Sequence, residues 1–145
     1  EQRDFLVKQA KVTAEDFGLD IHIIYHSYDD SGIILFDQPI KMIGYKAFYG
    51  CTNLTGITLP NSITSIVESA FQDCRNLANI TIPDSVISIG RHAFYNCAKI
   101  TNITIPDSAT SIGSYAFYGC SQLATVTIGK AVTDIGYRAF YNDKN

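Results

Sequence analysis

One residue spacing recurs through most of this chain and restricts the folds available to it. The chain has 145 residues, and its four cysteines, Cys51, Cys74, Cys97 and Cys120, each follow the previous one by 23 residues. The same spacing relates the phenylalanines Phe48, Phe71, Phe94, Phe117 and Phe140. A fixed period of this length is typical of solenoids, in which each unit stacks on the next. Residues 43–145 therefore hold four full repeats and a partial fifth.

Each unit combines two hydrophobic patterns. Between Ile89 and Ile100, the apolar positions follow i, i+1, i+4 and i+7, which predicts a short helix or 3₁₀ turn. The segment Ile103-Thr104-Ile105 then alternates apolar and polar residues, which predicts a strand, and Pro106 ends it because proline has no N–H to donate. A unit this small cannot enclose its own apolar residues, so the units must stack to bury them.

The units share a longer pattern, Ile-Gly-x-x-Ala-Phe-x-x-Cys-x-x-Leu-x-x-Ile-Thr-Ile-Pro-x-Ser, which starts at Ile43 and reaches Ser62 in the first copy. This pattern resembles the BspA-type leucine-rich repeats, and the resemblance covers residues 43–145. It implies a leucine-rich-repeat solenoid of right-handed coils, with a parallel β-sheet on one face and short helical or 3₁₀ turns on the other. It also implies the usual setting of that family, which is the repeat region of a secreted or cell-surface protein, often with an adhesive role.

The first 42 residues differ from the repeats, and we expect them to form an N-terminal cap. Their apolar spacing predicts a helix at about 4–17 and a β-hairpin at about 21–37, and residues 33–42 are a weakened copy of the repeat. Such a cap hides the apolar end of a solenoid. The chain begins at Glu1 rather than Met, so we expect a processed chain or a fragment.

Charge and hydropathy exclude several partners. The net charge is −3 and only 17% of the residues are charged, so we expect no nucleic acid partner. No apolar run approaches the roughly 18 residues of a membrane span, so we expect no membrane insertion. The 1–42 segment carries −4 and the repeats carry +1, which predicts a nearly neutral repeat surface and a partner that is neither strongly acidic nor strongly basic.

The cysteines are expected to be buried free thiols. Equivalent positions in stacked coils lie about 4.8 Å apart with parallel side chains, whereas a disulfide needs Cβ atoms about 3.8 Å apart and side chains turned towards each other. A zinc site is disfavoured because the chain has no Cys-x-x-Cys pair.

No pattern indicates catalysis or a cofactor. His22 and His26 share one face of a predicted strand, about 13 Å apart, which is too far for a shared metal. The chain also lacks a Gly-x-Ser-x-Gly elbow and a glycine-rich phosphate loop. We therefore expect a protein that is not an enzyme and that carries no metal and no cofactor.

The first candidate binding surface is the outward face of the repeated strands. We call it the sheet face, and its candidate residues are Thr58, Asn79, Thr81, Asn102, Thr104, Thr125 and Thr127. These columns either stabilise the stack as side-chain ladders or present a neutral hydrogen-bonding platform to a protein or glycan ligand. Threonine ladders also occur on ice-binding surfaces, but only one full threonine column is present here.

The second candidate surface is a tyrosine column, which we call the aromatic edge. It consists of Tyr49, Tyr95, Tyr118 and Tyr141, with Gln72 interrupting it and Tyr45, Tyr115 and Tyr137 close in register. Tyrosine combines a large apolar ring with a polar tip and loses little entropy on binding. The alternative is that these rings only cover the turns and pack between coils.

Taken together, the residues and the resemblance predict a non-catalytic, extracellular or cell-surface module that binds a protein or glycan through its solenoid surface. The alternative is a structural spacer of a larger surface protein, with no ligand of its own. The incomplete fifth unit should leave Ile128, Ile135 and Phe140 partly uncovered, which predicts either end-to-end self-association at the C-terminal repeat or fraying of that end.

Overall fold

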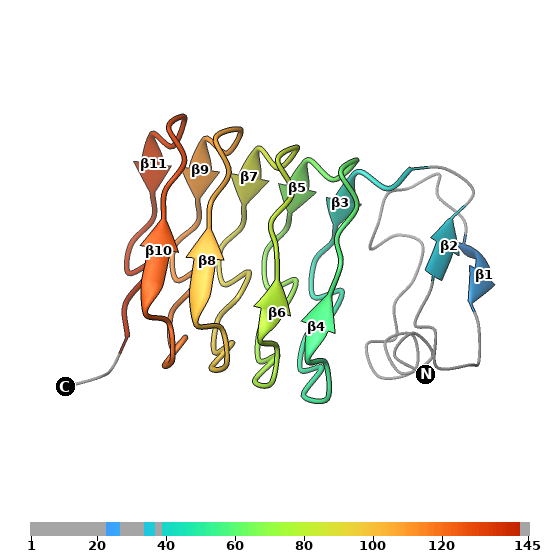
Figure 1. Ribbon diagram of the computed structural model, residues 1–145, viewed down its shortest axis with the longest axis horizontal. Helices are drawn as coiled ribbons and strands as arrows, with labels where there is room; N and C mark the ends of the chain where they lie inside the picture. The colour runs from blue at the N-terminus through green and yellow to red at the C-terminus, as the bar shows by residue number, and fades with distance from the viewer. Residues whose placement is uncertain (1–22, 27–33, 37–38, 143–145) are drawn as a thin grey trace.

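The computed structural model describes residues 23–26, 34–36 and 39–142 of the chain. Figure 1 shows the repeats as coils that lie side by side along the long axis of the molecule, in chain order. We number each coil from the isoleucine that opens it: Ile43 (coil 1), Ile66 (coil 2), Ile89 (coil 3), Ile112 (coil 4) and Ile135 (coil 5). The array is a parallel-strand β-solenoid.

The most continuous side of the solenoid is a stack of five two-residue parallel strands. These are β3 (Met42–Ile43), β5 (Ser65–Ile66), β7 (Ser88–Ile89), β9 (Ser111–Ile112) and β11 (Asp134–Ile135). Each residue pairs with the one 23 positions away, so that Ile66 pairs with Ile89. The sequence did not predict this sheet, because two residues are too few to show an alternating pattern.

The sheet face lies on another side of the coils and consists of two separate parallel pairs. Strand β4 (Gly56–Ile57) pairs with β6 (Asn79–Ile80), and β8 (Asn102–Thr104) pairs with β10 (Thr125–Thr127). The predicted alternation is confirmed, because Ile103 is buried and Thr104 is exposed. The predicted parallel sheet is therefore present, but it is divided between β6 and β8.

The third side does not form the expected helical turns, and the described residues contain no helix. In coil 1, the amide of Ala47 donates to the carbonyl of Gly44, three residues back, whereas the amide of Phe48 donates across to Ala70 of coil 2 at 2.8 Å. Lys46 and Gly50 have φ angles of 56° and 69°, in the left-handed region. Because left-handed residues interrupt a right-handed helix and alternate amides bond the next coil, the segment forms consecutive turns instead.

A glycine lets neighbouring coils approach each other closely on this side. A Cβ atom on Gly90 would lie 2.6 Å from the amide nitrogen of Glu68 and 2.7 Å from the carbonyl carbon of Val67. Contacts this short do not occur for real Cβ atoms, so any larger residue here would push coil 3 away from coil 2.

The core between the three sides is a set of stacked columns. The five repeated phenylalanine rings lie 5.0 to 5.2 Å apart between centroids and are within 8° of parallel. Isoleucine, alanine and cysteine columns fill the remaining interior. At coil 5, the predicted partial exposure is confirmed, since Ile128 and Ile135 are 41% and 54% exposed and Phe140 is half-buried.

Strands β1 (Ile23–His26) and β2 (Ile34–Phe36) pair antiparallel within the segment for which a hairpin at about 21–37 is predicted. The segment that connects them, the predicted helix at about 4–17 and His22 lie outside the described residues. The capping role of residues 1–42 stays a prediction. The described part of the chain has no helix with the length and apolarity that crossing a bilayer would need.

Candidate binding surfaces

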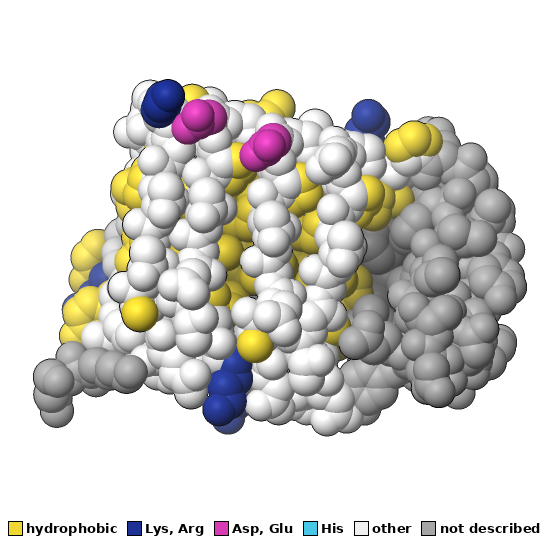
Figure 2. Space-filling view, viewed as in Figure 1, with side chains coloured by type: hydrophobic (Ala, Val, Ile, Leu, Met, Phe, Trp, Pro, Cys, Tyr) yellow, Lys and Arg dark blue, Asp and Glu magenta, His cyan; other side chains and the backbone are white. Residues whose placement is uncertain are grey.

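The sheet face presents hydroxyl and amide groups to solvent. All seven of its candidate residues, Thr58, Asn79, Thr81, Asn102, Thr104, Thr125 and Thr127, are exposed. Figure 2 looks onto this face and shows mainly uncharged polar surface, with hydrophobic side chains visible between the coils and charged side chains towards the two rims. The face is therefore an uncharged polar surface, and its use as a binding platform stays a prediction.

The platform is hollowed where its sheet is divided. The amide of Asn79 donates to Thr55 at 3.1 Å, and the amide of Thr125 donates to Thr101 at 3.3 Å. No equivalent backbone hydrogen bond joins residues 78–82 to residues 101–105, although both stretches lie within the described structure. The strands consequently separate between coil 2 and coil 3, and alternate amides and carbonyls there are left for solvent or a ligand.

An open groove of about 560 Å³ lies over coils 1 to 3 on this face. Its lining residues are Thr55, Gly56, Ile57, Thr58, Ala78, Asn79, Ile80, Thr81, Thr101 and Asn102. Four of the seven candidate residues thus border one hollow, and none of the lining residues is charged. Gly56 contributes to the hollow because it stands where coils 2 and 3 have asparagine.

The aromatic edge is ordered by ring stacking. Tyr95 and Tyr118 lie 5.1 Å apart between centroids, and Tyr118 and Tyr141 lie 5.5 Å apart. A second row runs beside them, in which His92 stacks on Tyr115 at 5.3 Å and Tyr115 meets Tyr137 edge-on at 5.6 Å. The structure thus brings together most of the predicted tyrosines, and their rings pack between neighbouring coils. Tyr49 in coil 1 is separated from this row by Gln72.

Each end of the aromatic edge carries a cation held between two tyrosines. The Lys46 ammonium lies 5.2 Å from the Tyr45 ring centroid and 5.0 Å from that of Tyr49. In coil 5, the Arg138 guanidinium lies 5.2 Å from Tyr137 and 4.8 Å from Tyr141. Neither cation was among the predicted site residues, although the motif Tyr-basic-Ala-Phe-Tyr, shared by 45–49 and 137–141, could have indicated both.

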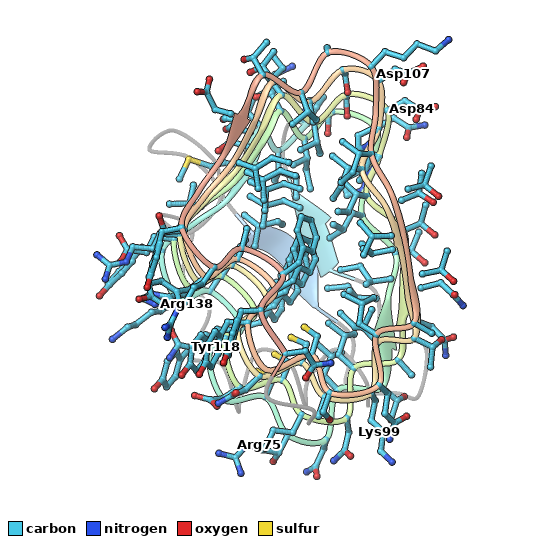
Figure 3. The ribbon with its side chains drawn as sticks, turned by 90° about the vertical axis from the view of Figure 1, so that its left-hand side faces the viewer. Arg75, Asp84, Lys99, Asp107, Tyr118 and Arg138 are labelled. Atoms are coloured by element: carbon cyan, nitrogen blue, oxygen red, sulfur yellow. The ribbon has the colours of Figure 1, made fainter. Side chains whose placement is uncertain are left out.

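The aromatic edge and the column of Asp84, Asp107 and Lys130 lie at different corners of the coil. In Figure 3, Arg138 and Tyr118 lie together at one corner, whereas Asp84 and Asp107 lie at the opposite corner. Burial and the neighbouring Arg91 lower the pKa of the His92 imidazole, which disfavours its charged form. The net charge of the repeats is therefore close to zero, although the aromatic edge is locally basic.

The cysteines are core groups. All four are free and buried, as predicted. The Cys74 thiol donates to the Phe48 carbonyl at 2.9 Å, and the Cys97 thiol donates to the Phe71 carbonyl at 3.1 Å. Burial raises the pKa of the Cys97 thiol well above its usual range and that of Cys120 to about 12. Within the described residues, no three His, Cys, Asp or Glu side chains gather in a way that would hold a metal ion.

Comparison with protein families decides the identity of the array. The family model described as the BspA type leucine rich repeat region matches residues 34–145 in six copies. This chain belongs to the BspA-type leucine-rich repeat family. The match includes residues 34–42 of the weakened copy that precedes the regular BspA-type repeats. Comparison with curated proteins gives no match.

Solved structures support the same assignment. The leucine-rich repeat protein of T. pallidum is 38% identical with a TM-score of 0.70, and the match covers 72% of this chain and 49% of that protein. A leucine-rich cell surface protein from Faecalibacterium prausnitzii is 39% identical with a TM-score of 0.66, covering 70% of this chain and 28% of that one. The pneumococcal vaccine antigen PcpA, at 23% identity and a TM-score of 0.56, shares the fold over 70% of this chain and 27% of its own. This BspA-type chain therefore spans about half the length, or less, of these proteins.

Proposed function

We propose that this chain is a non-catalytic binding or adhesion module of the cell surface, and that its sheet face recognises an uncharged part of a protein or glycan ligand. Membership of the BspA-type family and similarity to a protein described as a cell surface protein support the location. The groove over coils 1 to 3 is the observation that carries the proposed role.

The chemistry of the groove suits a polar, neutral ligand. Thr81 and Asn102 offer a hydroxyl and an amide, which both donate and accept hydrogen bonds. Ile57 and Ile80 are half-buried in the lining and supply apolar contact. Sites that combine apolar walls with a few convergent polar groups are typical of ligand recognition. Without charged residues in the lining, binding here should depend weakly on salt.

Binding to immobilised glycans and extracellular matrix proteins tests this proposal. The double variant Thr81→Ala/Asn102→Ala should weaken the interaction about tenfold or more, because it removes two polar side chains from the lining of the groove. Thr110→Ala, an exposed threonine next to the five-stranded sheet, is the matched control and should bind like the parent. Equal binding by the double variant and the parent would refute a role for the sheet face.

The alternative is a structural spacer, and the side-chain ladders favour it. Ser88 donates to Ser65 at 3.3 Å and the Asn96 amide donates to Asp73 at 2.9 Å, in each case between equivalent positions of adjacent coils. Outward polar columns thus contribute to the stack without any ligand. A spacer predicts that no immobilised ligand is retained by the parent chain.

A further inference from the structure

We propose that the aromatic edge is a second binding site, distinct from the sheet face, for a linear polysaccharide that carries carboxylate or sulfate groups. The site extends from Lys46 in coil 1, which lies over Tyr45 and Tyr49, to Arg138 in coil 5. Arg138 lies over Tyr137 and Tyr141. This site is independent of the function proposed above, because it uses another side of the coil and charged rather than neutral chemistry.

The two terminal cations are positioned to bind anions. Among the described residues, no carboxylate forms an ion pair with Lys46 or Arg138, and each instead lies within 5.2 Å of two tyrosine ring centroids. A guanidinium that stacks on aromatic faces keeps its N–H groups in its own plane, where they bind carboxylate or sulfate oxygens in pairs. Since the rings already hold these side chains in place, little side-chain entropy is lost on binding.

The balance of charge along the edge favours an anion over a cation. Lys46, Arg91 and Arg138 are the basic residues of the outward columns on this side, and Glu68 is acidic. Asp73, next to the tyrosine column, is a second acid, and it pairs with Arg75 at 3.6 Å. The acids Asp84 and Asp107 lie at the opposite corner (Figure 3). An anionic ligand on the edge therefore meets net attraction at short range, where screening by salt is incomplete.

The rings between the two cations suit a repeating sugar. From coil 3 to coil 5 the tyrosine row advances by 5.1 to 5.5 Å per coil, a spacing similar to that of successive sugar units in a linear chain. Tyr45 and Tyr137 are the most exposed members, at 57% and 63%. The rings of Tyr95, Tyr118 and Tyr141 cover each other's faces by stacking, so this row presents ring edges and hydroxyl groups to the polar groups of a sugar.

An acidic peptide fits the edge less well than a glycan. The backbone amides of this side are already used, as in Lys46 to Glu68 at 3.3 Å and Tyr115 to Tyr137 at 2.9 Å. No open strand is therefore available for main-chain pairing. Recognition must come from side chains, and tyrosine hydroxyls with the Lys46 and Arg138 cations supply the hydrogen-bonding and ionic contacts that an acidic sugar needs.

Binding of defined polymers to the full chain tests this proposal. The probes are polygalacturonate for carboxylate, dextran sulfate for sulfate, uncharged dextran, and poly-glutamate as the acidic peptide. We expect one or both acidic polysaccharides to bind with a salt-dependent affinity, and dextran to bind at least tenfold more weakly. Absence of binding by both acidic polysaccharides, or equal binding by dextran, would overturn the proposal, and tighter binding of poly-glutamate would assign the edge to peptides instead.

Matched variants locate the site. Lys46→Gln/Arg138→Gln should weaken acidic polysaccharide binding about tenfold or more, whereas Lys99→Gln/Lys130→Gln makes the same change of charge at exposed positions elsewhere and should change it less than twofold. Arg138→Lys keeps the charge but loses the planar fork, so its affinity should be intermediate. Circular dichroism should show that all variants keep the parental fold, and equal losses in the two double variants would reject the aromatic edge.

Discussion

At the scale of single residues, Gly90 shows that close approach rather than backbone freedom selects glycine. Gly90→Ala should lower the free energy of unfolding by about 3 kcal/mol, because the new Cβ overlaps the backbone of Val67 and Glu68. Gly50→Ala should cost only about 1 kcal/mol, since Gly50 has a positive φ but nothing within 4 Å of its Cβ position. Urea unfolding measures the loss of unfolding free energy in both variants. A larger loss for Gly50→Ala than for Gly90→Ala would contradict the packing between coils 2 and 3.

The buried thiols predict a fall in stability at alkaline pH. The folded pKa values of Cys97 and Cys120 are raised above the unfolded value of about 8.5, so the folded state retains these protons longer than the unfolded state does. The contribution of these protonated thiols to the free energy of unfolding is complete below about pH 8.5. It is lost as the pH rises towards 12, by up to about 1.4 kcal/mol per pH unit for each thiol.

Urea unfolding at pH 8, 9 and 10 in the presence of a reductant measures this dependence. The Cys97→Ala/Cys120→Ala variant should be less stable than the parent at pH 8 but should lose less stability as the pH rises. Tyrosine ionisation is common to both chains, so parallel pH profiles would show that the cysteines do not contribute.

At the scale of elements, the division of the sheet face has a direct signature in hydrogen exchange. The amide of Thr125 donates to Thr101, whereas the equivalent amide of Asn102 has no backbone acceptor in coil 2. Asn102 should therefore exchange its amide proton about tenfold or more faster than Thr125, because exchange follows the loss of hydrogen-bonded protection. Similar rates at the two positions would mean that β6 and β8 pair in solution.

Some of these elements could be predicted from the sequence and others could not. The alternation at Ile103-Thr104 predicted the sheet face, and the common period predicted its columns and the buried cysteines. The helical turns were not found, because the i, i+1, i+4, i+7 spacing also arises from consecutive turns whose alternate amides bond the next coil. The left-handed backbone at Lys46 and His92 could not be predicted from the sequence, because neither lysine nor histidine is among the residues that dominate turns. The groove was not predicted either, because nearly the same repeat pattern produces paired strands at β8 and β10 and separated strands at β6 and β8.

At the scale of the whole molecule, the last coil offers an apolar end to a neighbouring copy. We propose that copies of this chain associate end to end through the surface of coil 5, where Ile128 and Ile135 are exposed. Light scattering should show a molecular mass that rises with concentration, and Ile135→Asp should reduce it towards that of a monomer. A constant monomeric mass for the parent chain over the same concentrations would rule out this association.

Both proposed binding surfaces depend on coils that stack with a register of 23 residues. A solution NOE experiment on the chain with labelled isoleucine methyl groups tests that register most directly, because Ile43, Ile66, Ile89 and Ile112 are buried in one column of paired strands. Neighbouring strands lie about 4.8 Å apart, so we expect methyl cross-peaks from each of these residues to the next. Cross-peaks at another spacing, or none between residues 23 apart, would contradict the solenoid and with it both binding surfaces.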